Sequence, residues 1–144
     1  GVLYWRSAVT ITDIVDGTIN TLAVGERPPS PDMGYGWWQS ADTYNFVGVT
    51  TTWEWDTVQY VANTRGAPYF TEGETGAPCP FPAFYSPGRV DKVCDFNHFW
   101  SNHTGGANFV FGDGSVRFLP YSARPVMPQL ATRMGGETVD GSGF

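Results

Sequence analysis

The residues of this sequence with the clearest chemical potential lie in its last third: Ser101, His103 and, after nine further residues, Asp113. These are the residue types of a hydrolase triad, in which a histidine takes the proton of a serine nucleophile. Their context does not support that role, because no nucleophile-elbow sequence surrounds Ser101. An extended strand between His103 and Asp113 would also hold them on the order of 20 Å apart. We therefore expect no catalytic site and no enzyme, and we interpret Asp113 as a turn residue.

A second histidine, His98, raises the possibility of a metal site. His98 and His103 could share such a site with Asp95 or Asn102. The spacing of five residues between the two histidines matches no known ligand motif. We therefore favour hydrogen-bonded structural histidines over metal ligands.

Calcium is the more physical candidate among metals, because the chain is rich in carboxylate and amide oxygens. The candidate ligands form two clusters along the chain, Asp13, Asp16, Asn20 and Glu26 in the first and Asp91, Asp95 and Asn97 in the second. Neither cluster follows the spacing of an EF-hand loop. The alternative is that these side chains cap helices and bond turns. Calcium is thus the one cofactor that these residue types suggest.

Four tryptophans suggest a binding surface of another kind, for a carbohydrate or small solute: Trp37, Trp38, Trp53 and Trp55. Sugar rings stack on indoles, and contiguous exposed tryptophans signal either binding or subunit packing. A strand is expected over Tyr44–Trp53, and residues two apart on a strand share a face, which applies to Trp53 and Trp55. The favoured alternative is that the tryptophans fill a core poor in leucine and isoleucine.

The two cysteines, Cys79 and Cys94, are separated by a loop rich in proline and glycine. A redox or metal pair would place them about two residues apart, so we expect a structural disulfide. Closing this loop would stabilise the fold by roughly 3 kcal/mol in the chain-entropy model. A disulfide implies an oxidising, extracytoplasmic compartment.

A β-hairpin is the element that must position His103 and Asp113. Asp113-Gly114 is a preferred pair for a two-residue type I′ turn, with Gly112 opposite Ser115. This register pairs Phe111 with Val116, Phe109 with Phe118, Val110 with Arg117 and Asn108 with Leu119. One face of the hairpin is then aromatic and buried. Gly105-Gly106 allows the backbone to turn sharply before the first strand, with His103 at the strand's entrance.

Three further elements are expected, a helical turn over Asp13–Asp16 capped by Thr12 and ended by Gly17, a buried strand over Thr18–Gly25, and a helix over Val126–Met134 with Gly135 as its C-cap. Short strands separated by many loops and one convincing helix indicate a β-rich α+β fold. We expect the hairpin to belong to a central antiparallel sheet, with the short C-terminal helix packed beside it.

Composition limits the remaining possibilities. The length of 144 residues predicts a single globular domain over 1–144. A net charge of −6 and a single lysine, Lys92, argue against a nucleic-acid partner. No apolar run reaches the length of a membrane span, and no secretory signal is evident. The chain does not begin with Met, which suggests a processed form or part of a longer precursor.

Four blocks of the sequence resemble those of the prepilin-type H-X9-DG family that is abundant in planctomycete bacteria. His103 with Asp113-Gly114 matches the signature itself. The other blocks are Ile11–Glu26, with Ile19 where serine is more usual, Cys94–Ser101 and Leu130–Glu137. The blocks occur in the family's order and cover both ends of the chain.

The resemblance implies a type IV pilin-like or pseudopilin-like domain. Members of that family carry an N-terminal cleavage and methylation site and a long apolar helix, which anchors in the membrane and packs into a filament core. This chain would be the globular C-terminal part without that helix. Expected partners are other pilin-like subunits, in homo- or hetero-oligomers at the cell surface or in a secretion-type pseudopilus. Some classifications instead treat members as solute-binding proteins, so the alternative is an extracellular solute- or carbohydrate-binding domain.

Overall fold

The structure is a computed structural model and describes residues 1–3, 7–28, 59–60, 71–72, 77–79, 83–137 and 139. The strands are β1 (Leu22–Gly25), β2 (Gln59–Tyr60), β3 (Thr71–Glu72), β4 (Ala77–Pro78), β5 (Ala83–Phe84), β6 (Gly106–Phe111) and β7 (Val116–Pro120). The 3-10 helices are η1 (Ile11–Asp13), η2 (Thr18–Asn20), η4 (Val93–Asn97) and η5 (Tyr121–Val126), and the α-helix is α1 (Met127–Ala131).

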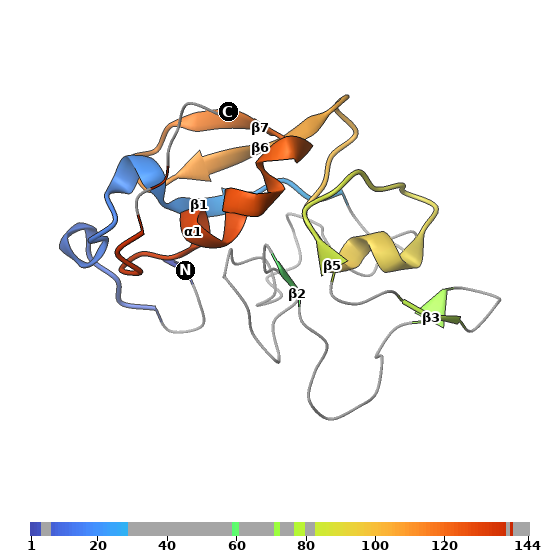
Figure 1. The fold of residues 1–144 in the computed structure, drawn as a ribbon, viewed down its shortest axis with the longest axis horizontal. Coiled ribbons are helices and arrows are strands. Elements are labelled where there is room, and N and C mark those ends of the chain that lie inside the picture. Colours follow the sequence, from blue (N-terminus) through green and yellow to red (C-terminus); the bar gives the residue numbers. More distant parts are fainter. Residues whose placement is uncertain are drawn as a thin grey trace.

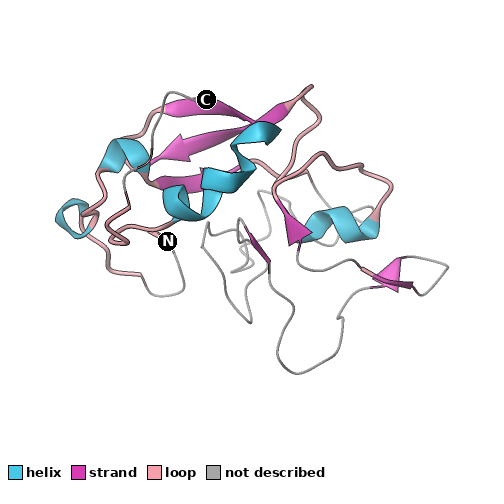
Figure 2. Ribbon diagram, in the orientation of Figure 1, coloured by secondary structure: helices cyan, strands magenta, loops and turns pink. Residues whose placement is uncertain are grey.

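The central element is a three-stranded antiparallel sheet in the order β1-β6-β7. Figure 1 shows these strands side by side, with η5 and α1 running alongside them. Two small antiparallel pairs, β2 with β5 and β3 with β4, lie away from this sheet. The helical segments are all short (Figure 2). The expected α+β fold, with an antiparallel sheet, a hairpin and a short C-terminal helix, is confirmed.

The hydrophobic core fills the space between one face of the sheet and the η5–α1 segment. Its largest fully buried side chains include Tyr85, Phe109, Phe111 and Met127. Phe109 meets the ring of Tyr85 edge to face at 5.4 Å between centroids, a geometry worth about 0.5–1.5 kcal/mol beyond the burial of the rings. Aromatic residues thus supply much of the core.

The hairpin β6–β7 forms, but its predicted register and turn are wrong by one residue. Phe109 pairs with Arg117, and the amide of Phe111 donates to the carbonyl of Ser115 at 2.9 Å. The loop therefore has three residues, and within it Gly114 adopts a φ of 84° and donates its amide to Phe111 at 2.9 Å. An Asp-Gly pair suits this loop as well as a type I′ turn, because both require a left-handed glycine.

This shift reverses the two faces of β7, because side chains alternate along a strand. Val116 and Phe118, expected to face Phe111 and Phe109 in the core, are 64% and 44% exposed. Leu119, expected on the other face, is buried. The buried aromatic face of β6 is as expected, but the outer face of the sheet carries an exposed apolar group on β7.

The elements flanking the sheet also differ from expectation in their bounds. The predicted helix begins earlier, as η5, and its α-helical part ends at Ala131, with Thr132 as the C-cap. Gly135 is therefore not the C-cap. The predicted strand over Thr18–Gly25 is a strand only from Leu22, because η2 occupies the residues before it.

The N-terminal helical turn is η1, and Thr10 caps it in place of Thr12. The amide of Thr10 donates to the carboxylate of Asp13 at 2.7 Å and its hydroxyl to the same oxygen at 2.8 Å. These two bonds lower the pKa of Asp13. In a capping box the acidic residue stands three positions after the N-cap. Asp13 therefore identifies Thr10, two residues before Thr12, as the N-cap of this helix. In the described part of the chain, no helix is long and apolar enough to cross a membrane.

The left-handed backbone of Gly114 leads to a first prediction. Gly114→Val should destabilise the domain by about 1–3 kcal/mol, since a β-branched residue is strained at positive φ. Gly114→Asn is the matched control and should cost less, because asparagine visits this region more readily. Thermal unfolding of the two variants measures the difference, and a Gly114→Val protein that melts with the parent would contradict the observed turn.

Candidate functional site

The entrance of the hairpin brings together His103, Glu26 and Asn108. The Oε2 atom of Glu26 accepts hydrogen bonds from the backbone amide of Asn108 at 2.8 Å and from its side-chain amide at 3.0 Å. The other carboxylate oxygen lies 3.3 Å from Nε2 of His103. His103 is thus held at the start of β6 by the residue that follows β1, while its side chain stays 57% exposed.

The turn that carries His103 is built around Ser101. Its hydroxyl donates to the carbonyl of Gly106 at 2.6 Å and accepts from the amide of His103 at 2.9 Å. Gly105 has a φ of 86°, and a Cβ on Gly106 would lie 2.1 Å from the carbonyl oxygen of Leu119. Both glycines of the predicted signature are therefore required by the backbone, one by its conformation and the other by close approach.

Sequence reasoning missed Tyr85, which joins this turn to the sheet. Its buried hydroxyl donates to the carbonyl of Leu119 at 2.5 Å and accepts from the amide of Ala107 at 2.7 Å. Ala107 and Leu119 are partners in the β6–β7 register, so the phenol oxygen bridges the two strands. Burial raises the pKa of the Tyr85 phenol, which keeps it neutral and able to donate. Nothing in the sequence around Tyr85 signals this contact.

Asp113 lies at the other end of β6, and its side chain bonds within the turn. Its Oδ1 atom accepts from the hydroxyl of Ser115 at 2.7 Å and from the Ser115 amide at 2.9 Å. These bonds lower the pKa of Asp113. The guanidinium of Arg117 lies 3.9 Å from Asp113 and 4.2 Å from the centre of the Phe111 ring. His103 and Asp113 thus stand at opposite ends of one strand.

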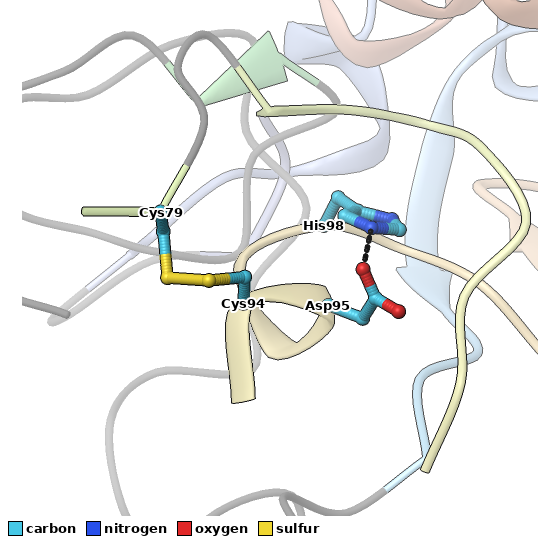
Figure 3. Close-up of a disulfide and its surroundings, with 4 residues drawn as sticks. All are labelled: Cys79, Cys94, Asp95 and His98. Carbon is cyan, nitrogen blue, oxygen red and sulfur yellow. Dashed lines mark hydrogen bonds and ion pairs between the residues drawn. A yellow bond between two sulfur atoms is a disulfide. The ribbon is translucent and has the colours of Figure 1, made fainter. Parts of the chain in front are cut away.

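The disulfide is confirmed and lies next to the second histidine (Figure 3). Cys79 and Cys94 are bonded and buried. His98 follows η4 as its C-cap, and Nε2 of this buried side chain lies 3.4 Å from a carboxylate oxygen of Asp95. The other ring nitrogen of His98 lies 3.1 Å from the carbonyl of Phe99. His98 is therefore a hydrogen-bonded core residue, and the structure does not bring it together with His103.

A contact between the two ends of the chain centres on Asp16. Its carboxylate accepts from the amides of Gly135 at 2.8 Å and Gly136 at 2.9 Å and from the hydroxyl of Thr132 at 3.0 Å. Burial opposes ionisation of this carboxyl, but the hydrogen bonds, led by those from Gly136 and Gly135, lower its pKa overall. Asp16 thereby closes the turn that follows α1.

A comparison with protein family models gives a match over most of the chain. Residues 1–125 match the family model SBP_bac_10, described as a protein of unknown function (DUF1559). The chain belongs to the DUF1559 family. Comparisons with curated proteins and with solved structures gave no significant match.

The DUF1559 match includes the features that position the candidate residues, from Asp16 and Glu26 through the disulfide to the whole of β6 and β7. It ends at Pro125, before α1 and the turn held by Asp16. The match establishes the DUF1559 family, but it does not establish the H-X9-DG assignment or the planctomycete origin that the resemblance implied. The resemblance to prepilin-type proteins is more specific than this match and is used below as a proposal.

The structure separates the candidate calcium ligands of this DUF1559 chain. In the first cluster Asp13 bonds Thr10, Asp16 bonds the turn after α1, and Glu26 bonds Asn108. In the second, Asp91 pairs with the guanidinium of Arg89 at 2.6 Å, while Asp95 accepts the Arg89 amide at 2.7 Å. Over the described ranges, no group of three or more His, Cys, Asp or Glu side chains could hold a metal ion. The hydrogen bonds are those of capping and turn chemistry.

The candidate sugar-binding tryptophans, Trp37, Trp38, Trp53 and Trp55, and the expected strand Tyr44–Trp53 lie outside the described residues. Their role stays a prediction. One shallow cavity of about 340 Å³ is present elsewhere, between residues 8–15 and the turn at Arg133–Met134. No tryptophan lines it.

The hydrogen bonds of Asp16 predict an acid-sensitive contact. Because the folded-state pKa is lowered, Asp16 stabilises the fold above its unfolded pKa of about 3.9, and this contribution is lost as pH falls through the folded value. Asp16→Asn should lower the free energy of unfolding by about 1–2 kcal/mol at pH 7, because the charged hydrogen bonds are lost. The difference in unfolding free energy between variant and parent should become smaller toward pH 3. Urea unfolding at several pH values measures it.

The control is Asp91→Asn, which removes an exposed carboxylate that pairs with Arg89. An exposed ion pair contributes little, so this variant should unfold with the parent at pH 7. A gap for Asp16→Asn that stays constant from pH 7 to pH 3 would contradict the assigned role of the ionised carboxylate.

Proposed function

We propose that this DUF1559 domain is a non-catalytic, extracytoplasmic structural protein, a pilin-like or pseudopilin-like subunit of a surface filament or secretion-type pseudopilus. The disulfide supports an oxidising compartment. The side chains of the predicted signature support a structural role, because the described contacts of His103, Asp113 and the two glycines serve the hairpin.

The observation that carries the proposal is the outer face of the sheet. The strand register places Val24, Val110 and Val116 in one row across all three strands, with Phe118 beside them. Val24, Val116 and Phe118 are all exposed, and Val110 is half-buried. An apolar face of this kind on a secreted domain is suited to packing against another subunit. We assign it to a neighbouring copy of this chain in the assembly.

Charge placed on this face tests the proposal. Phe118→Lys should abolish assembly without lowering the thermal midpoint, because the side chain is already exposed. Val90→Lys is the matched control, since Val90 is 52% exposed but lies on the loop before η4 and away from the sheet. Electron microscopy and sedimentation of the protein from its own source provide the readout. Assembly by Phe118→Lys at the parental level would overturn the proposal.

Native mass spectrometry of the source protein, with and without chelator, separates the proposal from its alternative. Polymers built from a longer form with a methylated N-terminus would support the pilin-like function. A discrete species that carries a sugar or another small ligand would instead favour a solute- or carbohydrate-binding domain. Loss of mass on chelation would identify a bound calcium ion.

A further inference from the structure

The turn before β6 contains an asparagine in a tripeptide context that no other asparagine of the chain shares. Among the six asparagines, only Asn102 is followed two positions later by serine or threonine, in Asn102-His103-Thr104. An Asn-X-Ser/Thr tripeptide whose middle residue is not proline is the acceptor sequence for N-linked glycosylation. The motif has meaning only on the surface of a protein that passes through an extracytoplasmic compartment.

The structure meets both conditions. Asn102 and Thr104 are exposed, in the irregular turn that precedes β6. Neither side chain makes a hydrogen bond within the described part of the chain, so both the amide and the hydroxyl are available. The confirmed disulfide indicates passage through an oxidising compartment.

The turn presents these two side chains without depending on them. Its backbone is held from inside by Ser101, which is 5% exposed and bonds both the His103 amide and the Gly106 carbonyl. A glycan on Asn102 would therefore project into solvent without disturbing the core. It would lie at the end of the hairpin where Gly106 pairs with Pro120, whereas Val110 and Val116 of the apolar face pair at the other end.

We propose that Asn102 is a site of N-linked glycosylation, with Thr104 as the recognised hydroxyl residue. The donor class is an oligosaccharide joined through its anomeric carbon to a lipid pyrophosphate. The side-chain nitrogen of Asn102 forms a bond to that carbon, and the bond from the carbon to the pyrophosphate oxygen breaks. The lipid pyrophosphate leaves with the electron pair, and the amide nitrogen gives one proton to a base of the transferase.

Peptide mass spectrometry of the protein from its own source tests this site. After reduction, trypsin releases residues 93–117 as one peptide, since Lys92 and Arg117 bound a stretch without internal lysine or arginine. The parent should yield this peptide with the added mass of an oligosaccharide, and fragmentation should assign that mass to Asn102. Asn97 and Asn108, in the same peptide, serve as internal controls.

Three variants make the test specific. Asn102→Gln and Thr104→Ala should lose the added mass completely, whereas Thr104→Ser should keep it, because serine preserves the hydroxyl. All three should keep the parental thermal midpoint, which separates a lost modification from a lost fold. An unmodified Asn102 in the parent, or added mass that persists in Thr104→Ala, would overturn the proposal, and neither result bears on the pilin-like function.

Discussion

Gly106→Ala is expected to destabilise the domain by about 3–5 kcal/mol, a large effect for the addition of a single methyl group. The new Cβ would lie 2.1 Å from the carbonyl oxygen of Leu119 and 2.9 Å from the ring of Phe118. Because the nearest atom belongs to the backbone of the paired strand, β6 and β7 must separate at this end. Overpacking costs about 1–3 kcal/mol, and each buried backbone group left unpaired adds about 1–3 kcal/mol.

Gly105→Ala is the neighbouring control. Gly105 has a positive φ of 86° but no atom within 4 Å of its added Cβ. Gly105→Ala should lower the free energy of unfolding by about 1–2 kcal/mol, because alanine is strained in the left-handed conformation. Urea unfolding of the two variants distinguishes steric exclusion from backbone conformation. An equal loss for both would show that the close approach of β7 to Gly106 does not restrict this position.

Tyr85→Phe is expected to cost about 2–4 kcal/mol although the variant retains the aromatic ring. The phenol oxygen is the partner of both the Ala107 amide and the Leu119 carbonyl, and all three residues are at most 1% exposed. Without the hydroxyl, two buried backbone groups lose their hydrogen bonds, and each costs about 1–3 kcal/mol. The expected loss is therefore larger than that of an ordinary hydrogen bond.

Tyr121→Phe provides a control in the same core. Tyr121 packs against Tyr85 with 4.9 Å between ring centroids. Among the described residues, its hydroxyl makes only long contacts, of 3.3 and 3.5 Å, with the backbone of Ser101. Its loss should cost below about 1 kcal/mol. Hydrogen exchange at the Ala107 amide should accelerate in Tyr85→Phe alone. Slow exchange there would mean that the strands close directly on one another and that the hydroxyl is dispensable.

Both predictions concern the contact between the disulfide-bonded segment and the β6–β7 hairpin. Tyr85 lies between the two bonded cysteines, whereas Gly106 is the first residue of β6, the first strand of the hairpin. The hydroxyl of Tyr85 connects these two parts of the chain through the backbone of β6 and β7. A defect at either residue should therefore also weaken the apolar sheet face proposed for assembly, because β7 carries Phe118.

The features that could be predicted were those formed by residues close in sequence and those that allow only one pairing. Two cysteines allow one disulfide. The glycines before β6 and the Asp-Gly pair after it predicted a hairpin between them, because turn residues act through local backbone conformation. The register was not predictable, since apolar residues on both faces of β6 and β7 leave the hydrophobic pattern nearly unchanged by a shift of one residue. Packing of Leu119 in the core and the bridge through Tyr85 decided it.

The α+β class, the hairpin, the disulfide and the oxidising compartment that a disulfide implies all follow from local sequence features. The contacts of Glu26 with Asn108 and of Asp16 with Gly135 and Gly136 become visible only in three dimensions, because these partners are 82 to 120 positions apart. Secondary-structure propensity and residue spacing report on interactions between residues that are close in sequence. Hydrogen bonds between distant segments depend on how the whole core packs, and in this protein those bonds hold His103, the hairpin and the C-terminal turn in place.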